Sequence, residues 1–190
     1  LTLVRNQYAL MVEEFARLIH ELDTNRFVFT ACEHSWRLSS ELAAWHDLGP
    51  SLDAVGVNSY YQQQISQLNQ LATHFDSTRP YLISEFGPSG YWNKAYSHYE
   101  DDSLLMEESD AQKAWIYGFQ WKEYVYNKKG QNIGGIAYCW RDRMEGSNTW
   151  FGITDVKGRL KPVYYALRNQ WTGKSWETDL YNVEIIKEQN

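Results

Sequence analysis

The sequence predicts an α/β fold with a parallel sheet. Apolar segments of strand length alternate four times with segments of helical periodicity, which indicates consecutive βαβ units. Neither G-x-G-x-x-G nor G-x-x-x-x-G-K-[ST] occurs after any predicted strand, and such phosphate loops would favour a doubly wound sheet. Polar side chains instead collect at the C-terminal ends of all four strands, as they do at the mouth of an α/β barrel.

The first half of the chain contains three of the predicted strands. Apolar side chains recur every three or four residues over residues 4–22, which predicts an amphipathic helix. The elements expected after it are a strand at 27–31, a short helix at 40–46, a strand at 53–61, a helix at 62–75 and a strand at 80–85.

The second half begins with a long predicted loop at 87–108. Ser109 is expected to cap a helix that runs to about residue 127, and Gly130 to end it. A fourth strand is predicted at 133–140, and Pro162 begins a last helix that ends at 171. The predicted loop at 87–108 is longer than about 12–15 residues, the length above which loops are usually functional or disordered.

Composition excludes several classes of partner. The net charge of −6, without a dense lysine or arginine cluster, argues against nucleic acid. No apolar run approaches the roughly 18 residues that a membrane span needs. Nine Trp and fourteen Tyr are a heavy aromatic load, and those in loops suit stacking on the apolar faces of sugars.

The ends of the chain and its cysteines add further expectations. The chain begins without Met and enters helical periodicity at once, so we expect a piece of a longer protein and no signal peptide. Cys32 and Cys139 form no disulfide framework and are expected to be free thiols. The five histidines lack metal-ligand spacing, so we predict no metal site and no cofactor.

The strand at 80–85 ends in a carboxylate, and a glycine follows almost at once. Glu85 lies where the strand meets the loop, the rim at which catalytic groups of α/β barrels project. From this segment alone, Glu85 is either a catalytic group or a strand-end residue that is paired with a basic neighbour.

Three strand-end motifs resemble those of the clan A glycoside hydrolases, family 2 above all. The segment I-S-E-F-G at 83–87 resembles their seventh strand, N-S-Y-Y at 58–61 the sixth, and A-Y-C-W at 137–140 the eighth. The segments at 150–155 and 158–167 resemble the usual end of the domain. The resemblance implies a partial (β/α)8 TIM barrel: helix 4, then strand–helix units 5 to 8.

The resemblance implies roles for three residues. Glu85 is then the catalytic nucleophile, Tyr60 its hydrogen-bond partner, and Trp140 the platform beneath the reacting sugar. The acid/base of such enzymes follows the fourth strand, which would lie before Leu1. Glu33 could replace it, but we expect Glu33 to bind a sugar hydroxyl or to pair with a nearby arginine.

The remaining candidates are expected to bind substrate. Asn58 either contacts the sugar or caps a loop, and His34 either contacts the sugar or only hydrogen-bonds at the start of its loop. Tyr91 and Trp92 lie in the long loop and are the best candidates for distal sugar contacts. The opposing interpretation is a lid that packs on the barrel without touching ligand.

The sequence therefore predicts the C-terminal part of a retaining β-glycoside hydrolase or transglycosidase that acts on an oligo- or polysaccharide. Without its acid/base we expect it to be inactive alone. The alternatives are a non-catalytic carbohydrate-binding or degenerate hydrolase-like domain, or a purely structural α/β domain. The half-barrel is predicted over 1–173, with a tail at 174–190 that starts a following β domain. Its open sheet should require the missing N-terminal half or self-association for cover.

Overall fold

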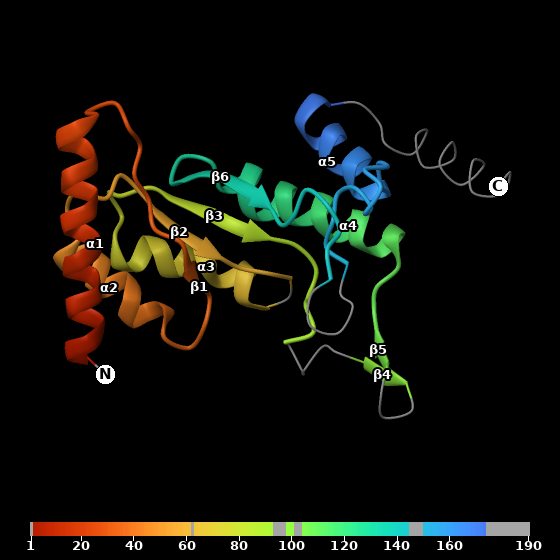
Figure 1. Ribbon diagram of the computed structural model, residues 1–190, viewed down its shortest axis with the longest axis horizontal. Helices are drawn as coiled ribbons and strands as arrows, with labels where there is room; N and C mark the ends of the chain where they lie inside the picture. Colours follow the sequence, from red (N-terminus) through yellow and green to blue (C-terminus); the bar gives the residue numbers. More distant parts are fainter. Residues whose placement is uncertain (1, 62, 93–97, 101–103, 145–149, 174–190) are drawn as a thin grey trace, which may run out of the picture. The chain divides into compact units, whose positions relative to one another are not determined.

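The computed structural model describes residues 2–61, 63–92, 98–100, 104–144 and 150–173 (Figure 1). The helices and strands are, in chain order, α1 (Thr2–Leu22), β1 (Cys32–Glu33), α2 (Leu38–Leu48), β2 (Val55–Asn58), α3 (Gln63–Phe75), β3 (Tyr81–Phe86), β4 (His98–Glu100), β5 (Leu104–Met106), α4 (Asp110–Gln120), β6 (Asn132–Ala137) and α5 (Pro162–Thr172). A π-helical turn and a 3₁₀ turn continue α4 as far as Lys128.

The chain forms two compact units. The first contains Leu1–Ser59, Gln63–Glu85 and Tyr124–Gly135, and the second Tyr60–Gln62, Phe86–Glu123 and Ile136–Asn190. The predicted tail at 174–190 lies outside the described residues, so its boundary stays a prediction. Within the described part of the chain, no helix combines the length and the apolar character that a membrane crossing requires.

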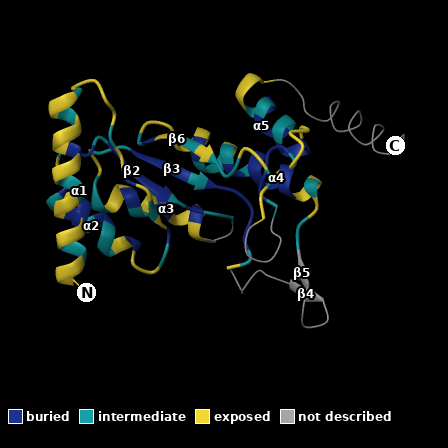
Figure 2. Ribbon diagram, viewed as in Figure 1, coloured by how far each residue is buried: buried dark blue, intermediate teal, exposed yellow. Residues whose placement is uncertain are grey.

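A four-stranded sheet is the main structural element of the first unit. Its strand order is β1-β2-β3-β6, with β1, β2 and β3 paired in parallel and helices between them. This is the α/β fold that the sequence predicts. β2 and β3 are apolar and almost fully buried, as strands covered on both faces are, and this burial makes them the core of the first unit (Figure 2).

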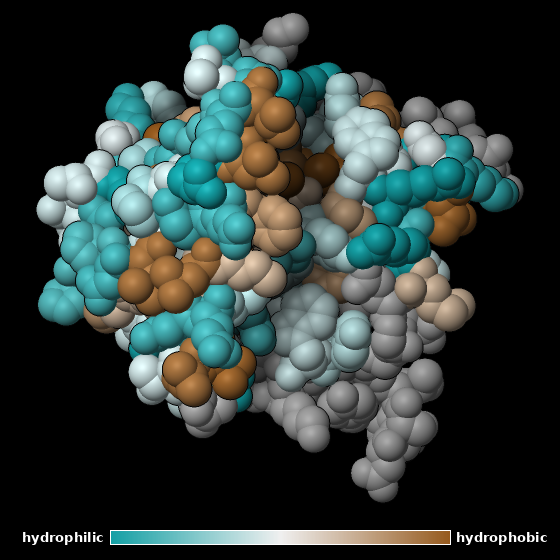
Figure 3. All heavy atoms as spheres, turned by 60° about the vertical axis from the view of Figure 1, so that its left-hand side comes forward, coloured by the Kyte–Doolittle hydropathy of each residue, from teal (hydrophilic) through white to brown (hydrophobic). Residues whose placement is uncertain are grey.

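Helix α1 packs through small residues and leaves large ones exposed. Its buried positions are Ala9 and Ala16, one heptad apart, on the side that meets α2. The apolar stripe that the sequence predicts lies on another side, where Phe15 is 57% exposed. Figure 3, which turns this side of Figure 1 forward, shows apolar patches between hydrophilic ones. The other exposed members of the α1 stripe are Val4, Tyr8, Met11, Leu18, Ile19 and Leu22.

In the second unit α4 and α5 pack against each other. Ser109 caps α4 as predicted, because its side chain accepts from the Gln112 amide while the Gln112 side chain accepts from the Ser109 amide at 2.8 Å. Pro162 stands in the first turn of α5, and Gly173 ends that helix with a φ of 70°, a left-handed conformation that favours glycine.

Several boundaries differ from the prediction, among them those of β2, which spans Val55–Asn58 and not 53–61. Residues 27–31 contain only an isolated bridge at Phe29, and β1 begins at Cys32. Its edge position explains this, since the Val28 amide donates to the Asp53 carboxylate at 2.7 Å instead of to a neighbouring strand. β6 ends at Ala137 rather than at 140, and the predicted loop at 87–108 contains the antiparallel pair β4 and β5.

Candidate functional site

The first unit brings three predicted site residues onto neighbouring strands. Glu33 is in register with Asn58, and Asn58 with Glu85, at the C-terminal ends of β1, β2 and β3. Backbone bonds continue the alignment: the His34 amide donates to the Asn58 carbonyl at 3.0 Å, and the Ser59 amide to the Glu85 carbonyl at 2.8 Å. We call these five residues the strand-end group.

The side chain of Asn58 is held by its neighbour. The Ser84 hydroxyl donates to Asn58 Oδ1 at 2.7 Å, which fixes the carboxamide beside the strand that carries Glu85. The register between β2 and β3 shifts between Gly56 and Asn58. The side chains at these two strand ends therefore do not follow the strict alternation of a regular ladder. The Glu85 side chain is partly exposed at this end.

His34 and Ser59 are the buried members of the strand-end group. His34 is only 7% exposed, and its Nδ1 lies 2.7 Å from the Ser59 hydroxyl. Burial lowers the pKa of His34 to about 4, so the ring is neutral near pH 7. His34 therefore contacts Ser59 as a neutral ring and not as a cation.

The buried histidine predicts an acid-sensitive stability. Unfolded His34 has a pKa of 6.5 and folded His34 of about 4, so the unfolded chain binds the extra proton between these values. Stability is complete above pH 6.5 and falls toward pH 4, by on the order of 3 kcal/mol from this residue. Urea unfolding of the wild type and of His34→Gln at pH 7 and pH 4.5 measures it. Equal pH dependence in both proteins would contradict the assignment.

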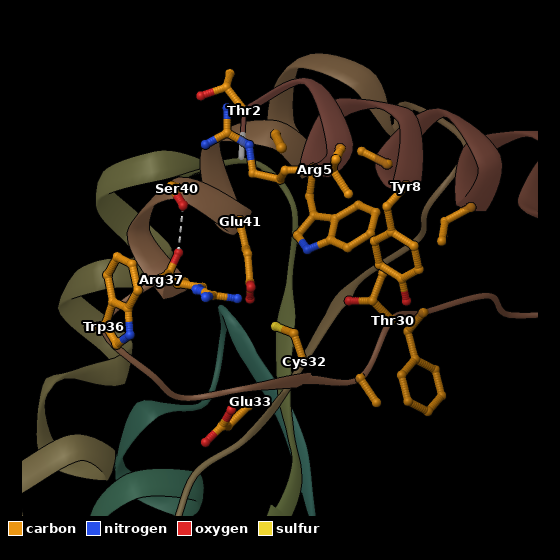
Figure 4. Close-up of a pocket in the computed structure, with 17 residues that line it drawn as sticks. Thr2, Arg5, Tyr8, Thr30, Cys32, Glu33, Trp36, Arg37, Ser40 and Glu41 are labelled. Carbon is orange, nitrogen blue, oxygen red and sulfur yellow. Dashed lines mark hydrogen bonds between the residues drawn. The ribbon is translucent and has the colours of Figure 1, made fainter.

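A cavity of about 780 Å³ adjoins the strand-end group between α1, α2 and the β1 segment (Figure 4). One side is charged and includes Arg5, Arg37 and Glu41. Burial raises the pKa of Glu41 and nearby Glu33 raises it further, while Arg37 and Arg5 act in the opposite direction. Burial also raises the pKa of Cys32 to about 12, so this thiol stays protonated.

Aromatic rings from four separate segments meet in the second unit. Tyr60 lies edge-on to Trp92, Tyr138 and Phe151, with ring centroids 5.1, 6.3 and 6.0 Å away. Tyr91 contacts the same Trp92 at 5.2 Å. We call these five residues the aromatic cluster. It unites three predicted site residues with two that the sequence did not indicate.

Trp92 is the exposed ring of this cluster. It stacks on Phe151 at 5.4 Å and 18° between planes, and it is 45% exposed, whereas Phe151 is 1% exposed. Gly90 allows this, because a Cβ there would lie 2.3 Å from the indole ring. Phe151 thus supports one face of an exposed indole.

The segment after β6 contributes to the cluster through Tyr138. The Arg143 guanidinium lies 5.3 Å from the Tyr138 ring centroid and donates to its hydroxyl. Trp140, the predicted platform, is 64% exposed. Aromatic residues at a strand end were a signal for Tyr138, but only the fold identifies Phe151.

Glu85 and Tyr60 belong to different units, so their hydrogen bond stays a prediction. Among the described residues, no cluster of His, Cys, Asp and Glu could hold a metal.

No family model and no curated protein sequence matches the chain. Several solved structures, by contrast, are similar to the chain in fold. A thermostable mutant of the xylanase Xyn10A from Cellvibrio japonicus has a TM-score of 0.62 at 15% identity, over 84% of this chain and 54% of that one. A GH2 β-galacturonidase from Eisenbergiella tayi has 0.57 at 17%, over 85% and 30%. A Bacteroides uniformis β-glucuronidase 2 mutant has 0.56 at 18%, over 85% and 19%.

These likenesses define the fold. The chain spans about half the length of the xylanase and less of the other two proteins. The solved structures are glycoside hydrolases built on TIM barrels, and at identities below 25% they show the architecture alone. The chain therefore has the fold of part of a TIM barrel, with the strand-end group at the C-terminal ends of its strands.

Proposed function

We propose that the chain is the C-terminal half of the catalytic barrel of a retaining β-glycoside hydrolase or transglycosidase of the family 2 type. The observation that carries the proposal is the register of Glu33, Asn58 and Glu85 at three adjacent parallel strand ends. That rim is where barrel enzymes place their catalytic groups. Glu85 is the proposed nucleophile, and Tyr60 orients it.

The reaction has two steps. A Glu85 oxygen attacks the anomeric carbon, the bond from that carbon to the glycosidic oxygen breaks, and an acid gives its proton to the departing oxygen. Water, or a sugar hydroxyl in transfer, then loses a proton to the same group and displaces Glu85. The two carboxyl groups must lie about 5–5.5 Å apart. We place the second one in polypeptide that precedes Leu1, so the chain alone is inactive.

The substrate is an oligo- or polysaccharide in this proposal. Trp92 presents an exposed indole face, with Tyr91 beside it, for a distal sugar ring. Trp140 remains the proposed platform for the reacting sugar, and we add Tyr138 because its ring contacts Tyr60. Asn58, Glu33 and His34 supply hydrogen bonds to sugar hydroxyls from the strand-end group.

Covalent trapping tests the proposed chemistry. Activated 2-deoxy-2-fluoro-β-glycosides of xylobiose, galacturonate and glucuronate are incubated with a longer parent protein that includes this chain, and peptides are analysed by mass spectrometry. We expect one glycosyl label, on Glu85, and none in Glu85→Gln. Binding of these sugars without a label would instead favour the non-catalytic carbohydrate-binding domain, and a label elsewhere would exclude Glu85.

The second part of the proposal concerns which polypeptide covers the open side of the half-barrel. β1 is an edge strand, and the α1 stripe is exposed beside it. Because crossovers between parallel strands are right-handed, the strand that precedes α1 would pair with this free edge of β1. The cavity of about 780 Å³ opens there. We propose the N-terminal half of the barrel as the occupant, since the chain spans 54% of the xylanase.

A charged residue in the α1 stripe should destabilise the parent protein but not the chain by itself. Phe15→Glu changes the unfolding free energy of the chain by less than about 0.5 kcal/mol, because residue 15 is exposed. In the parent, where the N-terminal half covers it, we expect a loss of about 3 kcal/mol. Chemical unfolding of both proteins measures the difference, with Glu14→Gln on the same helix as the control. Equal effects in both proteins would show that the stripe stays exposed.

A further inference from the structure

We propose that two ion pairs of buried lysines, Lys113 with Glu107 and Lys161 with Asp142, are a clamp that positions Phe151 and, through it, Trp92. The clamp holds the backbone on both sides of Phe151. Its role in sugar binding rests on the proposed function, whereas its role in orienting Trp92 does not. All these residues belong to the second unit.

Glu107 and Lys113 hold the residue before Phe151. The Glu107 carboxylate accepts from the Lys113 ammonium and from the Trp150 amide. Lys113 Nζ also donates to the Trp150 carbonyl at 2.7 Å. The pair therefore engages both the amide and the carbonyl of Trp150. This fixes the peptide plane that leads into Phe151.

Asp142 and Lys161 hold the residue after Phe151. Asp142 Oδ1 accepts from the Gly152 amide at 2.6 Å, and Lys161 Nζ donates to the two Asp142 oxygens at 3.2 and 3.1 Å. Lys161 also lies 3.4 Å from Asp110, at the start of α4. A Cβ at position 152 would lie 2.1 Å from the Asp142 amide nitrogen, so only glycine permits this close approach.

The held segment ends in the aromatic cluster. The Phe151 carbonyl accepts from the Tyr117 hydroxyl at 3.0 Å, so its backbone is held between the two carboxylate contacts. Its ring then stacks under Trp92 and touches Tyr60 and Tyr138. A change of the backbone at 150 or 152 must tilt the Phe151 ring, and Trp92 rests on that ring.

Burial explains why each carboxylate has a lysine. The Lys113 side chain is 2% exposed and the Asp142 side chain 9%. Burial lowers the pKa of Lys113, and the hydrogen bond and charge of the Glu107 carboxylate oppose that effect. A buried carboxylate that binds a backbone amide needs such a counter-ion, because an unpaired buried charge is strongly unfavourable.

Fluorine NMR of the chain labelled with 5-fluorotryptophan tests the clamp. The Trp92 resonance is the one that Trp92→Phe removes, and Gly90→Ala, which pushes on the indole, is the positive control. We expect Glu107→Ala and Asp142→Ala to shift or broaden it. Glu107→Gln and Asp142→Asn keep an acceptor oxygen for the Trp150 and Gly152 amides. These two variants should therefore leave the Trp92 resonance at its wild-type position. Leu167→Ala, a buried change in α5, controls for loss of stability alone.

The outcomes decide between a positioning role and a structural one. An unchanged Trp92 resonance in folded Glu107→Ala and Asp142→Ala would overturn the clamp, as would an equal shift in Leu167→Ala. Should an alanine variant not fold, its Gln or Asn counterpart decides: the wild-type resonance supports the proposal and a shifted one overturns it.

A sugar-binding measurement separates this inference from the proposed function. In the parent, we expect Asp142→Ala to weaken xylotriose or galacturonate binding about tenfold, the loss of roughly one hydrogen bond, and Asp142→Asn to leave it within about threefold. If the wild-type parent binds neither sugar, the proposed function fails, and the Trp92 resonances still decide the clamp.

Discussion

Glu85→Gln in the parent protein is expected to lower turnover by on the order of 10⁴-fold, because an amide cannot form the glycosyl-enzyme ester. The replacement keeps the size of the side chain and its place at the end of β3. Since the substrate still meets the same aromatic surface, we expect KM to change far less than kcat. Initial rates with an aryl glycoside measure both.

Glu33→Gln is the matched control for this variant. Glu33 is a carboxylate at the end of the next strand but one, in register with Asn58. As a hydrogen-bonding partner of a sugar hydroxyl, its loss should cost only about tenfold in kcat/KM. Full activity in Glu85→Gln would refute the nucleophile. A greater loss in Glu33→Gln than in Glu85→Gln would instead make Glu33 the catalytic carboxylate.

Lys113→Met is expected to lower the unfolding free energy of the chain by about 3–5 kcal/mol, the cost of breaking a buried ion pair by removing one partner. The variant leaves the Glu107 carboxylate with the Trp150 amide but without its counter-ion. The double variant Glu107→Gln/Lys113→Met removes both charges and keeps an acceptor for that amide. It should recover at least half of the loss.

Urea unfolding of the wild type, the two single variants and the double variant measures the coupling directly. The exposed pair of Arg17 with Glu21 on α1 is the control, where Arg17→Met should cost less than about 1 kcal/mol. A loss below about 1 kcal/mol for Lys113→Met would mean that solvent reaches the ion pair and replaces the lysine.

Much of the fold followed from local patterns. The alternation of apolar runs with helical periodicity predicted the order of β2, α3, β3, α4, β6 and α5, and the Ser109 cap and Pro162 marked two helix starts. The strand ends also predicted which polar residues lie at one edge of the sheet, although their roles stay predictions. Parallel strands bring their C-terminal ends to one edge, so Glu33, Asn58 and Glu85 could be expected together before their register was known.

Other features depended on contacts that no local pattern records. Periodicity identified the apolar stripe of α1, but not that the helix would pack through Ala9 and Ala16 and leave Phe15 outside. β1 was misplaced by several residues, because an edge strand with only one neighbour can pair over a short length. The Phe151 contacts also come from segments far apart in the chain.

The sequence by itself determined that this protein is built from parallel strand–helix units with polar groups at the strand ends, because burial and periodicity are written into neighbouring residues. Only the tertiary structure decided which side chains meet. Lys113 and Lys161 look like ordinary surface lysines in the sequence, yet packing of α4 against α5 and the loop after β6 buries them beside carboxylates. Such pairings arise from long-range packing, and we propose that they position the aromatic surface on which the proposed function depends.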